Sequence, residues 1–485
     1  MAAIAAALLS SAFALPALAR DVRPPAAPQA APAARPNILF ILVDDMGFAD
    51  LSVMGNRKIS TPNIDRLAAE GVLLTKFYDS APICSPSRAG LLTGRFPAEV
   101  GFVTFINDRA ANAAFGQKDW LDPALPNIAR TLKGAGYATA HIGKWHLGGG
   151  RDVWDAPLLT AYGFDESFTT FEGLGPRVLV SDHERFLADA SAKLGQGPFF
   201  YEIKTNLTQL FAQKTLEFVG KHKDQPWFVN LWLNDVHDPW APDDNSVQEV
   251  KGKGVSAEDD RYLATVVKMD RTIGNLVARL KDMGEADNTL IVITSDNGPA
   301  AQQRYYRDGA TAPGSVEALR GRKGSLYEGG IRQPLILHWP GHAKAGTRDE
   351  TTVAQGVDLL PTLAKLAGAA PLAGIDGIDL TPVLEGKAIA KRALLFWSFG
   401  MPSAARQPGG PSQPRDVAPG LAVRDGAWKL LAQPDGSDVQ LYDLQADPNE
   451  TTNLADRQPR VAKRLLAELQ KWAATLGKGA RPAGD

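Results

Sequence analysis

The sequence predicts an α/β fold in which helices flank a mostly parallel β-sheet, followed by a smaller antiparallel sheet and a helix. Apolar strand-like runs alternate with helical patterns over 36–375, as in chains built from successive β-α-β units. Over 376–485, short apolar runs instead precede one long amphipathic pattern. The chain has 485 residues, more than one hydrophobic core usually supports, so we expect a large part and a small part.

The N-terminal segment is predicted to be a signal peptide. Residues 1–19 form an apolar run that ends in Ala-Leu-Ala, a cleavage signature, directly before Arg20. The positive start of an ordinary signal is missing, because no Lys or Arg precedes Arg20. Residues 20–35 are rich in Pro and Ala and are predicted to be a linker. We therefore expect a periplasmic or secreted protein that is not membrane-embedded, since no other stretch resembles a membrane span.

Composition argues against a nucleic-acid partner. The chain carries 52 Lys and Arg against 54 Asp and Glu, a formal net charge of -2, so it lacks the basic surplus of nucleic-acid-binding proteins. It also has a single cysteine, which excludes an internal disulfide. The stability of an exported chain must then come from its core.

Four strand-like runs in the large part end in charged or metal-competent residues. The runs cover 37–43, 137–142, 227–232 and 289–294. Ligands of open α/β sheets bind outside the carboxyl ends of the strands, so we expect the residues that follow these runs to converge on one site. They are Asp44, Asp45, Lys144, His146, Asn234, Asp235, His237, Asp296 and Asn297.

The small part is predicted to be an antiparallel sheet with a final helix. An amphipathic helix over 359–366 closes the large part. Asp, Pro and Asn residues at 443–454 indicate a turn, and we assign this turn no catalytic role. Gly, Pro and Ser residues at 400–420 indicate a mobile loop. The predicted strands are 394–397, 420–424, 427–431 and 440–444, and the helix, with its apolar residues at helical spacing, runs from about 459 to 476.

The only cysteine, Cys84, begins the pentapeptide Cys-Ser-Pro-Ser-Arg. A free cysteine is most often a small buried apolar residue. Here prolines flank it, and 88–95 is predicted to be a short helix, with Pro86 suited to its first turn and Gly94 to its end. Cys84 is therefore expected at a helix N-terminus, where backbone N–H groups and the helix dipole favour an anion.

The pentapeptide and the Leu-Leu-Thr-Gly-Arg run at 91–95 resemble the signature of type I, formylglycine-dependent sulfatases of the alkaline-phosphatase superfamily. The resemblance extends from about residue 36 to the C-terminal helix, with separated motifs in matching order. It implies an alkaline-phosphatase-like fold and an arylsulfatase-like sulfuric ester hydrolase. It further implies that a formylglycine-generating enzyme oxidises Cys84 to formylglycine, whose hydrated aldehyde is the nucleophile.

Asp44 and Asp45, taken alone, could cap a helix or lie in a solvated loop. Together with Asp296 and Asn297 from a distant strand, they form an all-oxygen set suited to a hard divalent cation. The resemblance implies that these four residues, with the modified Cys84, ligate Ca²⁺, with Mg²⁺ as the alternative. Zinc is not expected, because the set has neither histidine nor an unmodified thiolate.

The resemblance also implies roles for the cationic residues near Cys84. Arg88 would hold the nucleophile or the metal ligands; otherwise it is a surface arginine. Lys144 would contact the sulfate and the nucleophile. His146, which lies on the same side as Lys144 if the segment is extended, would remove a proton from the second hydroxyl of the hydrate. A histidine at a strand end is, however, more often structural.

His237 and Lys323 are expected on the side of the leaving group. His237, helped by Lys323, would protonate the departing alcohol oxygen. Val236 departs from the family pattern, in which a proline precedes this histidine. Residues 319–332 closely match the sulfatase stretch that carries the lysine; the alternative is a solvated basic loop.

The sequence leaves the sulfate ester open, between a carbohydrate and an aryl alcohol. Two other functions remain. A phosphonate monoester or phosphodiester hydrolase would use the same Cys-x-Pro-x-Arg nucleophile, and a non-catalytic anion- or glycan-binding relative would keep Cys84 as a thiol. Some aromatic and basic residues could line the substrate pocket, although we expect most of them to be ordinary core or surface residues. They are Trp232, Trp240, Arg304, Tyr305, Tyr306, Arg307, Arg320, Arg177 and His183.

Overall fold

The computed structural model describes residues 35–183, 185–302, 311–389, 392–400 and 413–476. The predicted signal peptide and most of the predicted linker lie outside the described residues, as do 401–412 of the predicted mobile loop and the candidate residues Arg304 to Arg307. Within the described part of the chain, we find no helix that is both long and apolar enough to cross a membrane.

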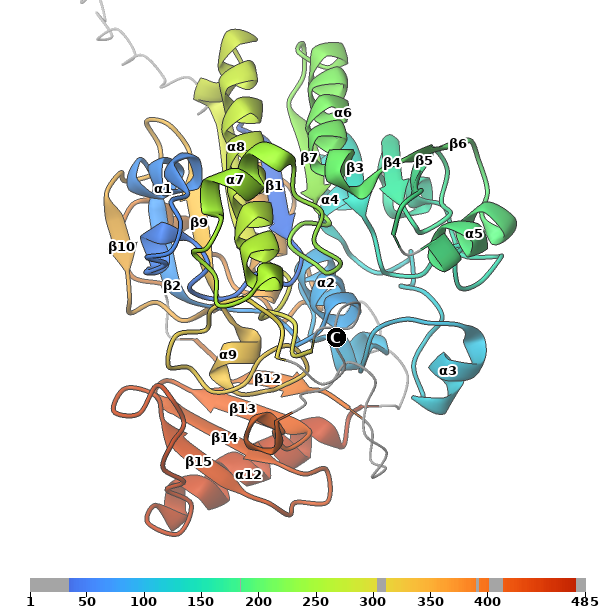
Figure 1. Ribbon diagram of the computed structural model, residues 1–485. Coiled ribbons are helices and arrows are strands. Elements are labelled where there is room, and N and C mark those ends of the chain that lie inside the picture. The colour runs from blue at the N-terminus through green and yellow to red at the C-terminus, as the bar shows by residue number, and fades with distance from the viewer. Residues whose placement is uncertain (1–34, 184, 303–310, 390–391, 401–412, 477–485) are drawn as a thin grey trace, which may run out of the picture. The chain divides into compact units, whose positions relative to one another are not determined.

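A large sheet forms the centre of the described chain, and most of its strands are parallel (Figure 1). Seven neighbouring strands run parallel to one another, in the order β8, β1, β7, β3, β4, β5 and β6. Strand β9 lies between β8 and β2 and is antiparallel to both. Strands β10 and β11 pair in parallel with β2. This confirms the predicted α/β class. The strands are β1 (Asn37–Val43), β2 (Val72–Tyr78), β3 (Ala138–Lys144), β4 (Glu166–Thr170), β5 (Arg177–Val180), β6 (Phe199–Glu202), β7 (Trp227–Trp232), β8 (Thr289–Ser295), β9 (Arg332–His338), β10 (Thr347–Asp349) and β11 (Ala354–Gln355).

Helices cover both faces of this sheet, which explains why β1 is a continuous apolar run. Leu39 and Ile41 pack in one core with α1 (Pro62–Ala69), α6 (Leu207–Lys221) and α8 (Ala257–Asp282). Alternate residues of the same strand face the other core. That core contains α2 (Cys84–Thr93), α4 (Ile128–Gly134) and α10 (Leu359–Leu366). The remaining helices are α3 (Arg109–Ala114), α5 (Arg185–Leu194), α7 (Asp244–Val250), α9 (Glu328–Ile331), α11 (Thr381–Leu384) and α12 (Pro459–Ala473).

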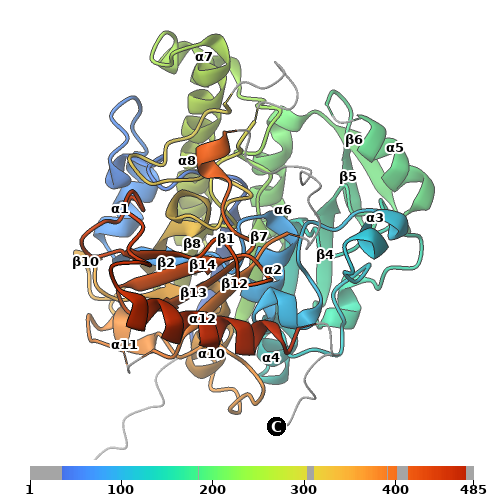
Figure 2. The ribbon, with the colours of Figure 1, turned by 90° about the horizontal axis from the view of Figure 1, so that it is seen from below.

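The predicted small sheet is present and has the order β12-β13-β14-β15, antiparallel throughout. The ends of its strands differ from those of the predicted runs by one residue at most. The strands are β12 (Leu395–Ser398), β13 (Leu421–Asp425), β14 (Trp428–Ala432) and β15 (Gln440–Asp443). Figure 2 shows α12 lying across the sheet. A third core joins this sheet to the residues around the cysteine, since Trp397 of β12 packs with Ile83 and Ile331.

Candidate active site

The carboxyl ends of β1, β3, β7 and β8 carry the residues that we expected to converge, and the structure brings them together. Backbone hydrogen bonds fix the segments to one another. The N–H of Asp44 donates to the carbonyl of Asp235 (3.0 Å), and the N–H of Asp296 donates to the carbonyl of Val43 (3.0 Å). The site therefore lies at the edge of the sheet that the strand ends predicted.

Four of the predicted ligands form a buried cluster. Asp44, Asp45, Cys84 and Asp296 each offer one ligand atom, and these atoms all lie within 4.8 Å of one another. Asp45 Oδ2 and Asn297 Oδ1 are buried and have no hydrogen-bond partner among the described residues. Buried oxygens without partners are costly unless a cation binds them. The oxygen donors thus fit a hard divalent cation.

The electrostatics of the cluster agree with this fit. Burial, opposed by the charge of Arg88 and reinforced by the neighbouring carboxylates, raises the pKa of Asp296 to about 6. Burial acts in the same direction on Asp44, but Lys144 and three other cationic side chains hold the pKa of Asp44 well below its usual range. The surrounding cations therefore keep part of the cluster ionised.

Arg88 is completely buried, so the surface alternative is wrong. Its Nε and Nη2 lie 2.8 Å and 2.7 Å from Asp296 Oδ2, and its Nη1 donates to the carbonyl of Lys144 (2.9 Å). Its guanidinium also lies over the ring of Trp232, 5.2 Å from the ring centre. Arg88 thus holds the predicted metal ligand Asp296 and the end of β3. Of the two roles expected for it, holding the nucleophile or holding the metal ligands, this geometry fits the second.

Two lysines lie against the cysteine. Lys323 Nζ is 3.1 Å from Cys84 Sγ and pairs with Asp45, and Lys144 Nζ is 3.7 Å from the same sulfur and 2.5 Å from Asp44 Oδ2. The solvated-loop alternative for Lys323 is wrong, because only 4% of this residue is exposed.

Helix α2 begins at Cys84 itself, four residues before the start of the helix that the sequence predicted. Burial raises the pKa of the Cys84 thiol to about 11 despite the two ammonium groups.

His146 reaches the site by a different backbone path from the predicted one. Strand β3 ends at Lys144, and His146 has φ 55°, so an extended segment from Lys144 to His146 is wrong. The turn follows Gly143, whose φ of 109° suits only glycine. Burial, reinforced by nearby cations of which Lys144 acts most strongly, holds the pKa of His146 well below its usual range. The imidazole is therefore neutral at neutral pH and available as a base.

His237 lies beside the acidic cluster and is anchored by Asp238. Its Nδ1 is 2.5 Å from the backbone oxygen of Asp238 and 3.3 Å from Asp238 Oδ1. Its Nε2 is 3.7 Å from Asp45 Oδ2. The ring is thus held through Nδ1, with Nε2 directed toward the cluster.

Buried lysines that the sequence analysis missed hold the His237 segment. Lys268 of α8 donates to the backbone oxygen of Ala241 (3.2 Å) and pairs with Asp235 (3.3 Å), and Lys204 donates to the backbone oxygen of His237 (3.3 Å). The signal in the sequence is a lysine between apolar residues of a long amphipathic helix, Val-Val-Lys-Met. Such a lysine, when it packs inward, needs buried oxygen partners.

Several candidate pocket residues prove to be structural. Trp232 and Trp240 are buried in the two cores that flank the sheet. Arg320 lies over the ring of Tyr327 (3.7 Å) and donates to the carbonyl of Arg415. His183, which is partly exposed, pairs with its neighbour Asp182. These four residues thus lie in the cores or contact neighbours of their own, as the sequence analysis expected of most of the candidates.

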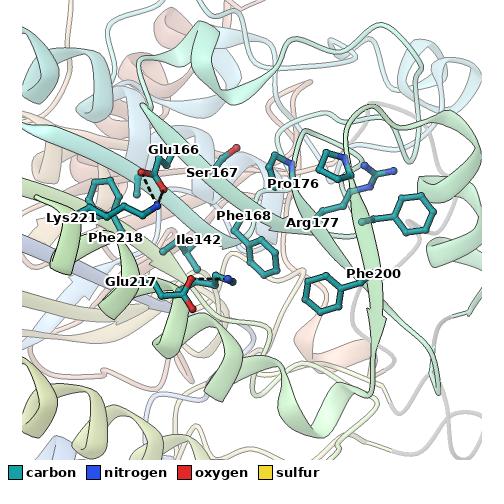
Figure 3. Close-up of a pocket in the computed structure, with 14 residues that line it drawn as sticks. Ile142, Glu166, Ser167, Phe168, Pro176, Arg177, Phe200, Glu217, Phe218 and Lys221 are labelled. Atoms are coloured by element: carbon teal, nitrogen blue, oxygen red, sulfur yellow. Dashed lines mark hydrogen bonds and ion pairs between the residues drawn. The ribbon is translucent and has the colours of Figure 1, made fainter.

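Arg177 belongs to a different pocket, shown in Figure 3. Its guanidinium donates to the backbone oxygens of Ser191, Gln196 and Gly197, so it ties the start of β5 to α5 and to the segment before β6. The pocket has a volume of about 370 Å³ and lies between α6 and β3 to β6. Phe168 and Phe200 stack there at 5.9 Å. None of the residues that line it belongs to the acidic cluster.

A family model of sulfatases matches residues 36–369, which include every residue of the site described above. This chain belongs to the sulfatase family. A second model, N-sulphoglucosamine sulphohydrolase, C-terminal, matches residues 322–475 of the sulfatase. The resemblance seen in the motifs is thereby confirmed, and the protein is a sulfuric ester hydrolase.

Curated relatives and solved structures agree with this assignment. The sulfatase is 35% identical over 382 residues to N-acetylgalactosamine-6-sulfatase of Sus scrofa, covering 75% of this chain and 68% of that protein. It is 31% identical over 490 residues to human arylsulfatase A, covering 91% and 88%. The structure of Ps i-CgsB in complex with k-i-k-neocarrahexaose superposes with a TM-score of 0.72 at 26% identity, covering 92% and 94%. Phosphonate monoester hydrolase of Agrobacterium radiobacter, at 22% identity and a TM-score of 0.61 over 91% and 95% of the two chains, shows the same fold.

Proposed function

We propose that this sulfatase hydrolyses a sulfate monoester of a carbohydrate and that Cys84 acts in its formylglycine form. The observation that carries the proposal is the placement of two buried lysine ammonium groups and an acidic cluster around one side chain at the start of α2. A terminal sulfate has three non-bridging oxygens, and a compact cationic pocket stabilises the charge that they carry in the transition state.

The carbohydrate part of the proposal is supported by the relatives. One is an N-acetylgalactosamine-6-sulfatase, and one solved structure is a complex with a neocarrahexaose. Both names contain the name of a carbohydrate. An aryl sulfate remains the simpler test substrate, and human arylsulfatase A is a relative over most of both chains.

We propose that Asp44, Asp45, Asp296 and Asn297, with the modified Cys84, hold Ca²⁺, and that Mg²⁺ is the alternative. The support is the buried acidic cluster, in which Asp45 Oδ2 and Asn297 Oδ1 have no hydrogen-bond partner among the described residues. When bound, the cation would neutralise charge on the transferring sulfate. Arg88 would keep Asp296 in place, since both of its contacts to that carboxylate are short.

In the formylglycine form, the side chain at position 84 supplies a hydrated aldehyde, with one hydroxyl to attack sulfur and a second to release it. The other groups work around it. Lys144 and Lys323 hold the sulfate oxygens. His237 gives a proton to the alcohol oxygen as the bond between that oxygen and sulfur breaks. Neutral His146 then takes the proton of the second hydroxyl, so that sulfate leaves with the enzyme oxygen and the aldehyde C=O bond re-forms at position 84.

We also propose that the chain is exported, with 1–19 as signal peptide, 20–35 as linker, 36–375 as catalytic domain and 376–485 as C-terminal subdomain. A formylglycine-generating enzyme would then be an obligatory partner, acting on Cys84. The protein would be found in the periplasm or outside the cell.

The proposed function is tested with the chain co-expressed with a formylglycine-generating enzyme. Mass spectrometry of the tryptic peptide 77–88 should find aldehyde at Cys84. The same preparation should cleave 4-nitrophenyl sulfate and sulfated N-acetylgalactosamine with a higher kcat/KM than a phosphonate monoester or a bis-aryl phosphate, because the ratio reports differential transition-state binding. A fully active preparation that contains only thiol would refute the mechanism. Preference for the phosphorus esters would favour the alternative hydrolase.

Metal removal gives a second test. Exhaustive chelation should abolish turnover, and Ca²⁺ or Mg²⁺ should restore it. Asp296→Ala should lower bound metal, measured by elemental analysis, together with kcat, because it removes one charged ligand and the nearest ion-pair partner of Arg88. Asp189→Ala, at an exposed aspartate of α5 that pairs with Arg185 outside the cluster, is the matched control and should change neither. Full activity with no detectable metal would exclude this site.

A further inference from the structure

Three charged side chains from separate segments meet in the interior beneath α9. Lys429 Nζ of β14 lies 3.0 Å from Glu328 Oε1 of α9 and 2.9 Å from Glu450 Oε1, which follows β15. All three side chains are fully buried. We call Glu328, Lys429 and Glu450 the buried triad. Glu450 belongs to the 443–454 stretch, whose predicted turn is confirmed by the hydrogen bonds from the N–H groups of 451 and 452 to Asp447.

Stability alone is a poor explanation for this arrangement. Burying two carboxylates around one ammonium group has a desolvation cost that the attraction only partly offsets, and apolar replacements of buried ion pairs are often neutral or stabilising. The triad is nevertheless specific in its geometry. Tyr78 donates a hydrogen bond to Glu328 Oε2 (2.6 Å), so both oxygens of that carboxylate have partners.

The triad is bonded directly to the backbone of α9. Glu450 Oε2 accepts the N–H of Glu328 (2.7 Å), which is the first residue of that helix. The first N–H groups of a helix have no partner within the helix, so a carboxylate there fixes the helix start. Lys429 at the side chain and Glu450 at the main chain of Glu328, together with the hydrogen bond from Tyr78, therefore hold the start of this short helix.

Helix α9 is the C-terminal part of a segment that we call the Lys323 loop, residues 320–331. Within the loop, the N–H of Gly329 donates to the carbonyl of Arg320 (2.7 Å). The loop also bonds to the other parts of the site. Its N–H of Gly324 donates to the carbonyl of Pro82 (2.7 Å), two residues before Cys84, and its carbonyl at Gly330 accepts the N–H of Gly298 (3.0 Å).

The Lys323 loop is packed too tightly to absorb a displacement. A Cβ added at Gly329 would lie 2.2 Å from the carbonyl oxygen of Gly321, and one at Gly330 would lie 2.0 Å from that of Ser325. Backbone segments at this distance move together. A shift of Glu328 is therefore transmitted to Lys323, five residues away, whose Nζ lies 3.1 Å from Cys84 Sγ.

We propose that Lys429 and Glu450, both outside the predicted catalytic domain, are positioning residues for Lys323, acting through Glu328 and the close-packed Lys323 loop. This inference rests on the proposed role of Lys323 beside the reacting group. It assigns the C-terminal sheet a part in catalysis in addition to packing.

A double-mutant cycle tests the coupling on the full, converted enzyme. Lys429→Met should lower kcat about 10- to 100-fold, the effect of misplacing a catalytic group by about 1 Å, with a much smaller change in KM. Lys323→Ala should lower kcat at least as much. The double variant should be no slower than Lys323→Ala alone, because a displaced lysine cannot be lost twice. Multiplicative effects of the two substitutions would overturn the proposal.

The control separates positioning from general stabilisation. Trp472 Nε1 of α12 donates to Glu99 Oε1 (2.8 Å), another bond between the C-terminal helix and the large part of the fold. Trp472→Phe removes that bond without touching the Lys323 loop. It should lower Tm with kcat unchanged, and an equal fall in kcat for both variants would refute the positioning role. If Lys429→Met fails to fold, Glu450→Gln, which keeps the shape, takes its place in the cycle.

The positioning role and the proposed function can fail independently in these experiments. The cycle is run on whichever ester the native enzyme cleaves best. Preference for a phosphorus ester would refute the sulfate monoester proposal, while non-additivity between positions 429 and 323 on that ester would still support the coupling.

Discussion

Cys84→Ser is expected to reduce the enzyme to at most one turnover. Serine supplies one hydroxyl, which can take the sulfuryl group from the ester, but it has no second hydroxyl through which the enzyme–sulfate bond can break. Steady-state kcat should fall on the order of 10⁴-fold or more, the scale of losing a group that forms the covalent bond. Rapid-quench measurement with 4-nitrophenyl sulfate should show no more than one equivalent of 4-nitrophenol per enzyme.

The control for this variant is Ser87→Ala in the same helix. Ser87 is fully buried, and its Oγ has no hydrogen-bond partner among the described residues. The substitution leaves Cys84, Pro86 and Arg88 intact, so conversion and turnover should persist. Continuous turnover by Cys84→Ser at a rate near that of the native enzyme would show that the second hydroxyl is not needed.

The sequence predicted the architecture well because the strands that carry the site are buried on both faces. The runs at 37–43 and 227–232 coincide with β1 and β7. Parallel strands place their carboxyl ends at one edge, so Asp44 and Asp296 could be predicted to meet although 252 positions separate them in the numbering.

Backbone detail and long-range polar contacts were not predictable in the same way. His146 adopts a left-handed backbone that no side-chain pattern specifies, and the extended interpretation failed there. The roles of Lys429 and Glu450 depend on which strands of the small sheet face α9. That depends on tertiary packing, because a lysine inside a strand is equally compatible with a solvated face.

His237→Ala is expected to discriminate between leaving groups. A sugar alkoxide is a poor leaving group and needs protonation as the bond to sulfur breaks, whereas 4-nitrophenolate leaves without it. The variant should therefore lose about 10²- to 10⁴-fold in kcat/KM on a sugar sulfate and much less on 4-nitrophenyl sulfate. The geometry supports this role, since Asp238 holds Nδ1 and leaves Nε2 directed toward the acidic cluster.

Both kcat/KM values are measured for the native enzyme, His237→Ala and the control His222→Ala. His222 lies after α6, where its Nδ1 contacts Gln225 (3.2 Å), so its loss should leave both substrates unaffected. Equal losses on the two substrates in His237→Ala would mean that this histidine does not donate the proton. The candidate general acid would then be Lys323, whose ammonium lies 3.1 Å from Cys84 Sγ and pairs with Asp45.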